Sequence, residues 1–139
     1  MPRKTTVKKA RAALRQGKSP TTAAGEFVRE EIEHVREGKH GARSPEQAIA
    51  IGLSKARRAG VPLKPPGKGQ ARKRTRRSAQ RDYEIGQGKR KRRALSSKRS
   101  KASTRRLKRE PRSTVSREAL SRHARRTAGS RAKRKSRKT

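Results

Sequence analysis

Apolar residues recur with helical spacing through residues 44–60, SPEQAIAIGLSKARRAG, where the local helix signals all agree. Ser44 is suited to cap the helix, Pro45 fits its first position, and Gln47 completes a capping box. Gly60 supplies the left-handed residue that ends a helix, and the next proline prevents continuation. The apolar side of this predicted helix consists of Ala48, Ile49, Gly52, Leu53, Ala56 and Ala59. Because most of these residues are small, we expect a packing partner to approach closely.

A second amphipathic helix is predicted over residues 19–37. It begins with the same Ser-Pro pair, and Gly38 and Gly41 follow its end. Glu31 interrupts its apolar face, so we expect this carboxylate to pair with a basic residue of the next helix. The apolar face itself carries Ala24, Phe27, Val28, Ile32 and Val35.

The short connection between these helices predicts an antiparallel helical hairpin over residues 19–60. Burial of its large side chains, at about 1.5–3 kcal/mol each, does not offset ordering of the chain at roughly 1.5 kcal/mol per residue. We therefore expect added stability from a homodimer, from a basic N-terminal arm at residues 1–18 packing across the hairpin, or from a bound target. The predicted hairpin core is Phe27, Val28, Ile32, Val35, Ile49, Leu53 and Ala56.

Residues 61–71 form a predicted linker, since their prolines and glycines disfavour both helix and strand. The charge balance changes there: residues 1–66 hold 15 basic and 6 acidic residues, whereas residues 67–139 hold 30 and 4. We predict that residues 72–139 form a basic, largely disordered tail. Short nascent helices are expected at 78–85, 103–108 and 116–128. The predicted fold class is mainly α with extensive disorder.

Composition favours a polyanionic partner. Only 26% of the 139 residues are hydrophobic and 1% are aromatic, while 45 basic and 10 acidic residues give a net charge of +35. Clusters of Lys and Arg release counterions from phosphates, which is the main source of sequence-independent affinity for nucleic acid. The residues predicted to bind nucleic acid are Arg72, Lys73, Arg74, Arg76, Arg77, Lys89, Arg90, Lys91, Arg92, Arg93, Arg105, Arg106, Lys108, Arg109, Lys133, Arg134 and Lys135.

Duplex DNA is favoured among the nucleic acids. Stacking on unpaired bases uses aromatic side chains, and the basic half of the chain has only Tyr83. Nothing in the sequence resembles a base-reading recognition helix. We therefore expect a non-catalytic protein of histone-like or nucleoid-associated type that binds duplex DNA in the cytoplasm by phosphate neutralisation. Two alternatives stay open: an RNA- or ribosome-associated basic protein, and a protein-interaction module built on the hairpin.

No enzymatic activity, cofactor, metal site or small-molecule substrate is expected. His34 lies one turn after Glu30, with Glu33 and Glu37 nearby, but a metal needs three or four convergent ligands. We interpret this segment as an exposed, charged helix face. Nucleophile motifs and phosphate-binding loops in a strand and helix context are also absent from the sequence. No apolar run approaches the roughly 18 residues of a membrane span, so no membrane association is expected.

The 44–60 stretch resembles the motif S-x-x-Q-A-I-A-I-G-L-S-x-A-R-x-A-G of a family of small, basic bacterial proteins without an established activity. The flanking segments GEFVREEIEHVREGKHGARS and RDYEIGQGKRK are similar to a subgroup labelled plasmid stabilisation proteins. That label implies DNA association at most. The motif stands here as Ser44, Gln47, Ala48, Ile49, Ala50, Ile51, Gly52, Leu53, Ser54, Ala56, Arg57, Ala59 and Gly60.

Overall fold

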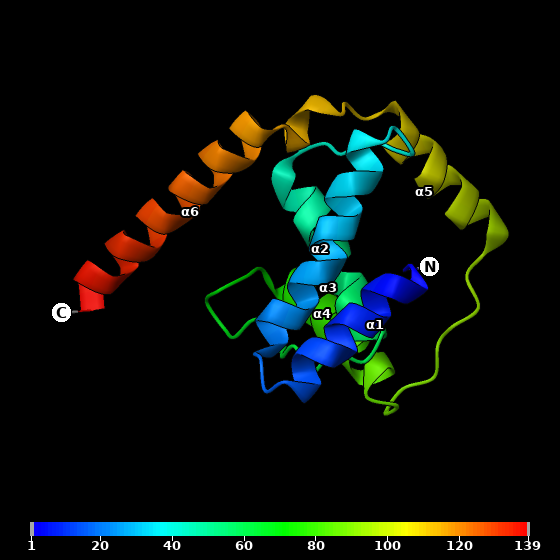
Figure 1. The fold of residues 1–139 in the computed structure, drawn as a ribbon, viewed down its shortest axis with the longest axis horizontal. Helices are drawn as coiled ribbons and strands as arrows, with labels where there is room; N and C mark the ends of the chain where they lie inside the picture. The colour runs from blue at the N-terminus through cyan, green and yellow to red at the C-terminus, as the bar shows by residue number, and fades with distance from the viewer. Residues whose placement is uncertain (1, 139) are drawn as a thin grey trace.

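Six α-helices make up the described part of the chain, which confirms the mainly α prediction (Figure 1). The computed structural model describes residues 2–138, and no strand is present within that range. A single 3₁₀ turn, η1, connects the last two helices. The elements are α1 (Lys4–Arg15), α2 (Pro20–Arg36), α3 (Pro45–Arg58), α4 (Lys73–Gly86), α5 (Ser97–Arg109), η1 (Ser113–Val115) and α6 (Arg117–Lys138).

The predicted hairpin is formed by α2 and α3, and both helices begin at the predicted serine caps. The Ser19 hydroxyl accepts a hydrogen bond from Thr22 N at 3.3 Å, and the Ser44 hydroxyl accepts one from Gln47 N at 3.2 Å. The Gln47 side chain accepts from Arg43 N at 2.6 Å, one residue before the expected capping-box donor. These caps satisfy amide groups that the first helical turns leave without intrahelical partners.

The small-residue side of α3 does allow a close approach, and the partner is α2. A Cβ atom built on Gly52 would lie 2.6 Å from Val28 Cα, so only glycine fits there. The predicted hairpin-core residues Phe27, Val35 and Ala56 are buried. The other four predicted core residues are partly exposed: Val28, Ile32, Ile49 and Leu53.

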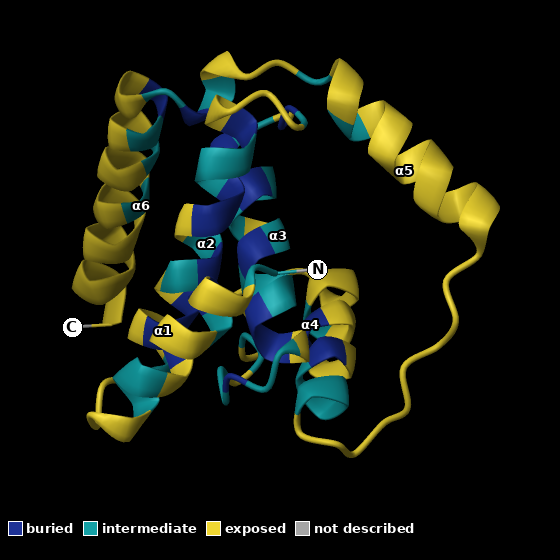
Figure 2. Cartoon of the chain, turned by 45° about the vertical axis from the view of Figure 1, so that its right-hand side comes forward, coloured by how far each residue is buried: buried dark blue, intermediate teal, exposed yellow. Residues whose placement is uncertain are grey.

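The core consists of two clusters, one at each end of the hairpin (Figure 2). In the first cluster, α1 crosses α2. The N-terminal arm therefore packs across the hairpin, which is one of the three sources of added stability that we expected. Its buried members are Ala10, Ala23, Ala24, Phe27, Ala56 and Val61. The second cluster joins Val35, Ala42 and Ala48 to Val115, which belongs to η1 in the basic half of the chain. Alanine thus supplies much of the buried apolar surface of this chain.

The prediction of extensive disorder in the basic half is wrong, and α4 gives the first reason. α4 packs on α3 through the buried residues Ala79 and Asp82. The Asp82 carboxylate accepts hydrogen bonds from Arg58 Nε at 2.7 Å and from the Ser54 hydroxyl. One buried, fully paired carboxylate therefore fixes a strongly basic helix to the hairpin.

A second anchor lies at residues 110–116, where the chain returns to the end of the hairpin. Val115 is fully buried there. Arg36 donates hydrogen bonds to the Val115 carbonyl at 3.2 and 3.3 Å, and Arg112 donates to the Val35 carbonyl at 3.1 Å and to the Arg36 carbonyl. Arg112 therefore bonds two carbonyl groups in the last turn of α2, and Arg36 bonds a carbonyl group of η1. No structural role for Arg36 or Arg112 was predicted from the sequence.

Candidate nucleic acid interface

Two helices extend from the core and present most of their surface to solvent. α5 has no buried residue, and α6 has only Ala119. Figure 1 shows α5 and α6 leaving the top of the core on opposite sides, and Figure 2 shows both as largely exposed. We call α5 and α6 the outer helices.

The outer helices carry 17 basic side chains, seven on α5 and ten on α6, against a single carboxylate, Glu118. Some of these like charges lie four residues apart, for example Lys101 with Arg105 and Arg105 with Arg109. Such pairs destabilise a helix in water by about 0.2–0.5 kcal/mol each, and phosphate groups would relieve this repulsion. α6 has 22 residues and is about 33 Å long at 1.5 Å per residue.

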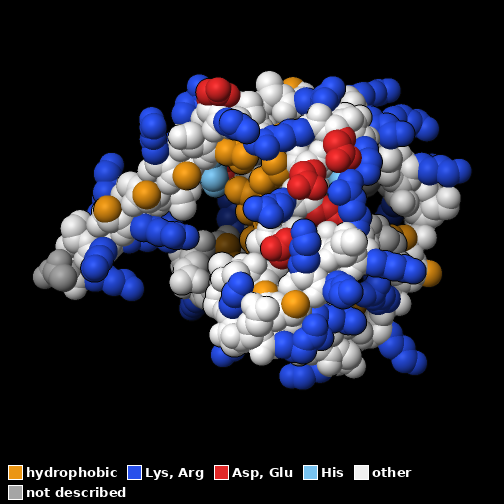
Figure 3. All heavy atoms as spheres, viewed as in Figure 1, with side chains coloured by type: hydrophobic (Ala, Val, Ile, Leu, Met, Phe, Trp, Pro, Cys, Tyr) orange, Lys and Arg blue, Asp and Glu red, His pale blue; other side chains and the backbone are white. Residues whose placement is uncertain are grey.

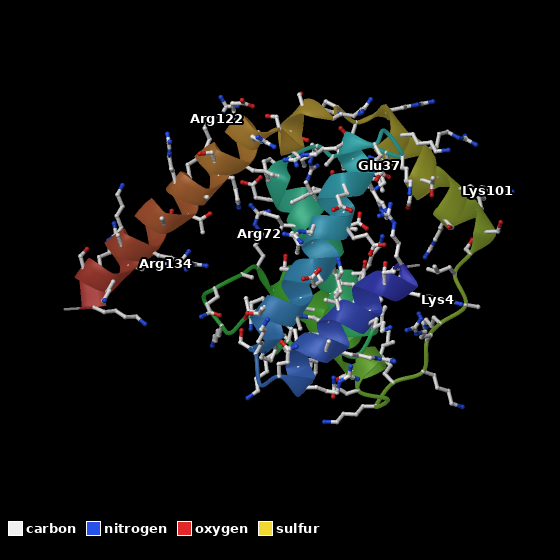
Figure 4. The ribbon with its side chains drawn as sticks, viewed as in Figure 1. Lys4, Glu37, Arg72, Lys101, Arg122 and Arg134 are labelled. Atoms are coloured by element: carbon white, nitrogen blue, oxygen red, sulfur yellow. The ribbon has the colours of Figure 1, made fainter. Side chains whose placement is uncertain are left out.

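The residues predicted to bind nucleic acid lie on four separate elements and form no single pocket. Residues 72–77 surround the start of α4, residues 89–93 follow its end, residues 105–109 close α5, and residues 133–135 lie near the end of α6. Figure 4 shows the spread: Arg72 lies near the core, whereas Lys101 and Arg134 lie on the two outer helices. The candidate interface is therefore a set of exposed basic surfaces around the core.

Two of the predicted residues already have internal partners. Arg90 Nε pairs with Glu84 Oε2 at 2.9 Å, and Arg92 donates to the Arg58 carbonyl at 3.0 Å. Hydrogen bonds from Gln80 and then Arg90 lower the pKa of Glu84. These two arginines help to hold the end of α4, which makes them weaker candidates for phosphate contact than the cations of the outer helices.

Several exposed cations of the outer helices were not among the predicted binding residues, because those were chosen from clusters of consecutive Lys and Arg. On a helix, residues three or four positions apart are neighbours, so spaced cations form the same kind of surface. That spacing is the signal that identifies them in the sequence. The additional cations of this kind on the outer helices include Lys98, Arg99, Lys101, Arg122 and Arg125.

Most carboxylates pair with cations of the core and leave nearly all cations of the outer helices uncompensated. Among the described residues, seven of the ten carboxylates form ion pairs, and these engage six Lys or Arg residues: Arg3, Lys39, Lys55, Arg58, Arg90 and Arg126. Only Arg126 belongs to an outer helix. Figure 3 shows acidic side chains gathered over the middle of one face, with Lys and Arg around them. The predicted pairing of Glu31 with the next helix is confirmed, and its partner is Lys55.

α6 is oriented by a contact with the start of α3. The Glu46 carboxylate lies 3.0 Å from His123 Nδ1 and 3.7 Å from Arg126 Nη2. A hydrogen bond from the backbone N–H of Glu46 lowers the pKa of this carboxyl group, and the His123 contact lowers it further. Beyond residue 127, every described residue of α6 is exposed.

One group of side chains in the described part of the chain could hold a metal ion: Glu31, His34 and His40. Glu33 and Glu37, which lie near His34 in the sequence, pair with Arg3 at 3.4 and 3.2 Å. His40 was expected to have no partner, but the connection between α2 and α3 places its Nε2 atom 3.3 Å from Glu31 Oε2. The interpretation of this segment as an exposed helix face is wrong for Glu30 and Glu31, which are buried against neighbouring elements. Burial lowers the pKa of His34 despite the opposing effect of nearby carboxylates.

Comparisons with known protein families, with curated proteins and with solved structures found no match. The resemblance stated from the 44–60 motif therefore stays a prediction. Among residues 2–138, no helix combines the length and the apolar character needed to cross a bilayer.

Proposed function

We propose that this protein binds duplex DNA without sequence choice, through phosphate contacts made by the outer helices. The proposed role is non-catalytic and architectural, of the histone-like or nucleoid-associated type. One observation carries the proposal: 17 cations and a single carboxylate lie on two helices that contribute almost nothing to the core.

Counterion release gives this proposal its expected magnitude. Each phosphate neutralised on B-DNA contributes about 0.9 to the slope of log affinity against log salt. If roughly eight of the cations on the outer helices reach phosphates, the slope is about −7. The length of α6, near 33 Å, is similar to one turn of B-DNA at roughly 34–36 Å. Several cations of one helix can then face the backbone at once.

Side-chain chemistry favours duplex over single strands. The outer helices carry no Phe, Tyr or Trp on which an unpaired base could stack, and Phe27 is buried in the core. Arginine, the more frequent cation on α6, suits bidentate contact with phosphate.

The apolar side of the hairpin packs against α1 and Val115, which favours an intramolecular core over the homodimer alternative.

The test compares two triple variants of the full chain that lose the same charge. Lys133, Arg134 and Lys135→Gln alters the exposed end of α6, and Lys8, Lys9 and Arg11→Gln alters exposed positions of α1. Binding to duplex DNA, single-stranded DNA and structured RNA is measured at several salt concentrations. We expect the α6 variant to reduce the salt slope by up to about 2.7, and the α1 variant to reduce it much less.

Each outcome distinguishes between interpretations. An equal reduction of the salt slope in the two variants would mean that net charge alone drives binding, and it would contradict the proposed role of the outer helices. A preference for structured RNA at matched salt would replace the DNA proposal with the RNA-associated alternative. Far-UV circular dichroism of both variants verifies that the helices are retained.

A further inference from the structure

A buried group of metal-ligating side chains lies where α2 meets its connection to α3. Glu31 is fully buried, and the His34 and His40 side chains are 13% and 16% exposed. One ligand atom from each of the three lies within 4.8 Å of the others. None of these three residues belongs to the outer helices used in the proposed function, and the inference does not depend on that function.

The orientation of His40 is the first argument for a cation in this group. Its Nδ1 atom lies 2.8 Å from the Gly41 carbonyl, which can only accept a hydrogen bond. In the neutral imidazole, Nδ1 therefore carries the proton, and Nε2 presents a lone pair. That lone pair faces Glu31 Oε2 at 3.3 Å. Two electron-rich atoms in such contact need either a second proton on the imidazole or a metal cation between them.

The unpartnered oxygen of Glu31 is the second argument. Glu31 Oε2 is buried and has no hydrogen-bond partner, whereas Oε1 is engaged by the Lys55 ammonium. A buried carboxylate oxygen without a partner is costly, because it has lost its hydration. Lys55 thus balances part of the charge and leaves Oε2 directed at His40.

His34 completes a three-ligand arrangement. Its Nδ1 lies 3.7 Å from Glu31 Oε1, and its Nε2 lies 3.8 Å from Glu30 Oε1. Glu30 is itself buried, with Oε2 unpartnered. A carboxylate beside the far nitrogen of a ligating histidine is a common outer-shell arrangement, since it orients the ring.

We propose that Glu31, His34 and His40 bind a zinc ion, with water as the fourth ligand. Two histidines and one glutamate are an established zinc ligand set. Zinc–nitrogen and zinc–oxygen bonds of about 2.0–2.1 Å put tetrahedral ligand atoms roughly 3.3 Å apart, so modest side-chain adjustment suffices. The ion joins the end of α2 to residue 40. The neighbouring Gly41 N donates to the Leu107 carbonyl at 2.8 Å, so the ion steadies the point at which α5 is attached.

The experiment uses the full chain, without an affinity tag and freed of nucleic acid. Zinc is titrated calorimetrically into the wild type and into His34→Gln, His40→Gln and His123→Gln variants. His123 is the matched control, because it also faces a carboxylate but lies on α6, away from the group. We expect one zinc ion per chain for wild type and control, and affinity at least about tenfold weaker for the other two. Magnesium, which prefers oxygen ligands, should not compete.

Cobalt substitution of the wild type gives a readout that does not depend on whether the His34→Gln and His40→Gln variants fold. The wild type loaded with Co²⁺ should show the intense visible absorption of tetrahedral coordination, and His123→Gln should keep it. Absence of stoichiometric zinc binding to the wild type overturns the proposal. Equal zinc affinity in all four proteins does the same. In either case a proton shared between His40 and Glu31 accounts for the group.

Discussion

Replacing Gly52 with alanine tests the close approach of α2 and α3 directly. In a helix interior glycine is about 1 kcal/mol less favourable than alanine, so this change ordinarily stabilises a protein. Here the added Cβ would lie 2.6 Å from Val28 Cα and 2.9 Å from Val28 N. Because both are backbone atoms, a whole helix must move to make room, and overpacking of this kind costs roughly 1–3 kcal/mol. Because the clash is with backbone atoms, we expect a cost in the upper part of that range. After the gain from alanine is subtracted, the free energy of unfolding should fall by about 1–2 kcal/mol.

Gly25→Ala is the matched control, because it makes the same chemical change on the facing helix. A Cβ at Gly25 meets no atom within 4 Å, so the variant should gain about 0.5–1 kcal/mol. Urea unfolding followed by far-UV circular dichroism measures both, as opposite shifts of the midpoint with an unchanged slope. If Gly52→Ala is as stable as Gly25→Ala, α2 and α3 do not approach as described, and the reasoning is refuted.

Three further predictions concern the anchors of the basic half. Val115→Ala should lower the free energy of unfolding by roughly 2 kcal/mol and speed amide exchange at residues 112–120, whereas Leu95→Ala, at a position 77% exposed, should change it by less than about 0.5 kcal/mol. Asp82→Asn weakens the ion pair with Arg58 of α3 and should lower the free energy of unfolding in urea by about 1.5–3 kcal/mol. We expect a value near the lower end of this range, because Arg58 is half-exposed and solvent screens the pair. The lowered pKa of Glu46 means that its contribution is present above the usual glutamate range and is lost as pH falls through the lowered value. Thermal unfolding curves of the wild type and Glu46→Gln should therefore differ near neutral pH and converge in acid; a difference that persists in acid would contradict this assignment.

Local signals explain why the hairpin could be predicted from sequence. A serine cap, a proline at the first helical position and a terminal glycine act within one or two turns, so residues 19–60 contain the information themselves. Glu31 was predictable for a related reason, since an acid on an apolar face needs a partner that the neighbouring helix can supply. The zinc-ligand group was not predictable in this way, because His40 joins His34 only once the connection has folded back.

Long-range contacts explain why the order of the basic half was missed. Composition averages over the whole half, whereas its attachment depends on very few residues: Asp82 on α4, and Val115 with Arg112 after α5. Nothing local in the sequence distinguishes Val115 from an isolated apolar residue in a polar segment. The low hydrophobic content was also misleading, because alanine and glycine allow backbones to approach and a core to form with few large side chains.

The division of charge between core and outer helices gives the proposed function a further consequence. Most carboxylates pair within the core and its anchors, whereas the outer helices gain little stability from burial and suffer repulsion among their own cations. A polyanion should therefore stabilise α5 and α6 while adding little to the packing between α2 and α3. Distant, independent sites contribute additively, so Gly52→Ala should lower stability with little change in the salt slope, and the triple variant at residues 133–135 should do the reverse. Such a separation would identify the hairpin as the scaffold and the outer helices as the nucleic acid interface.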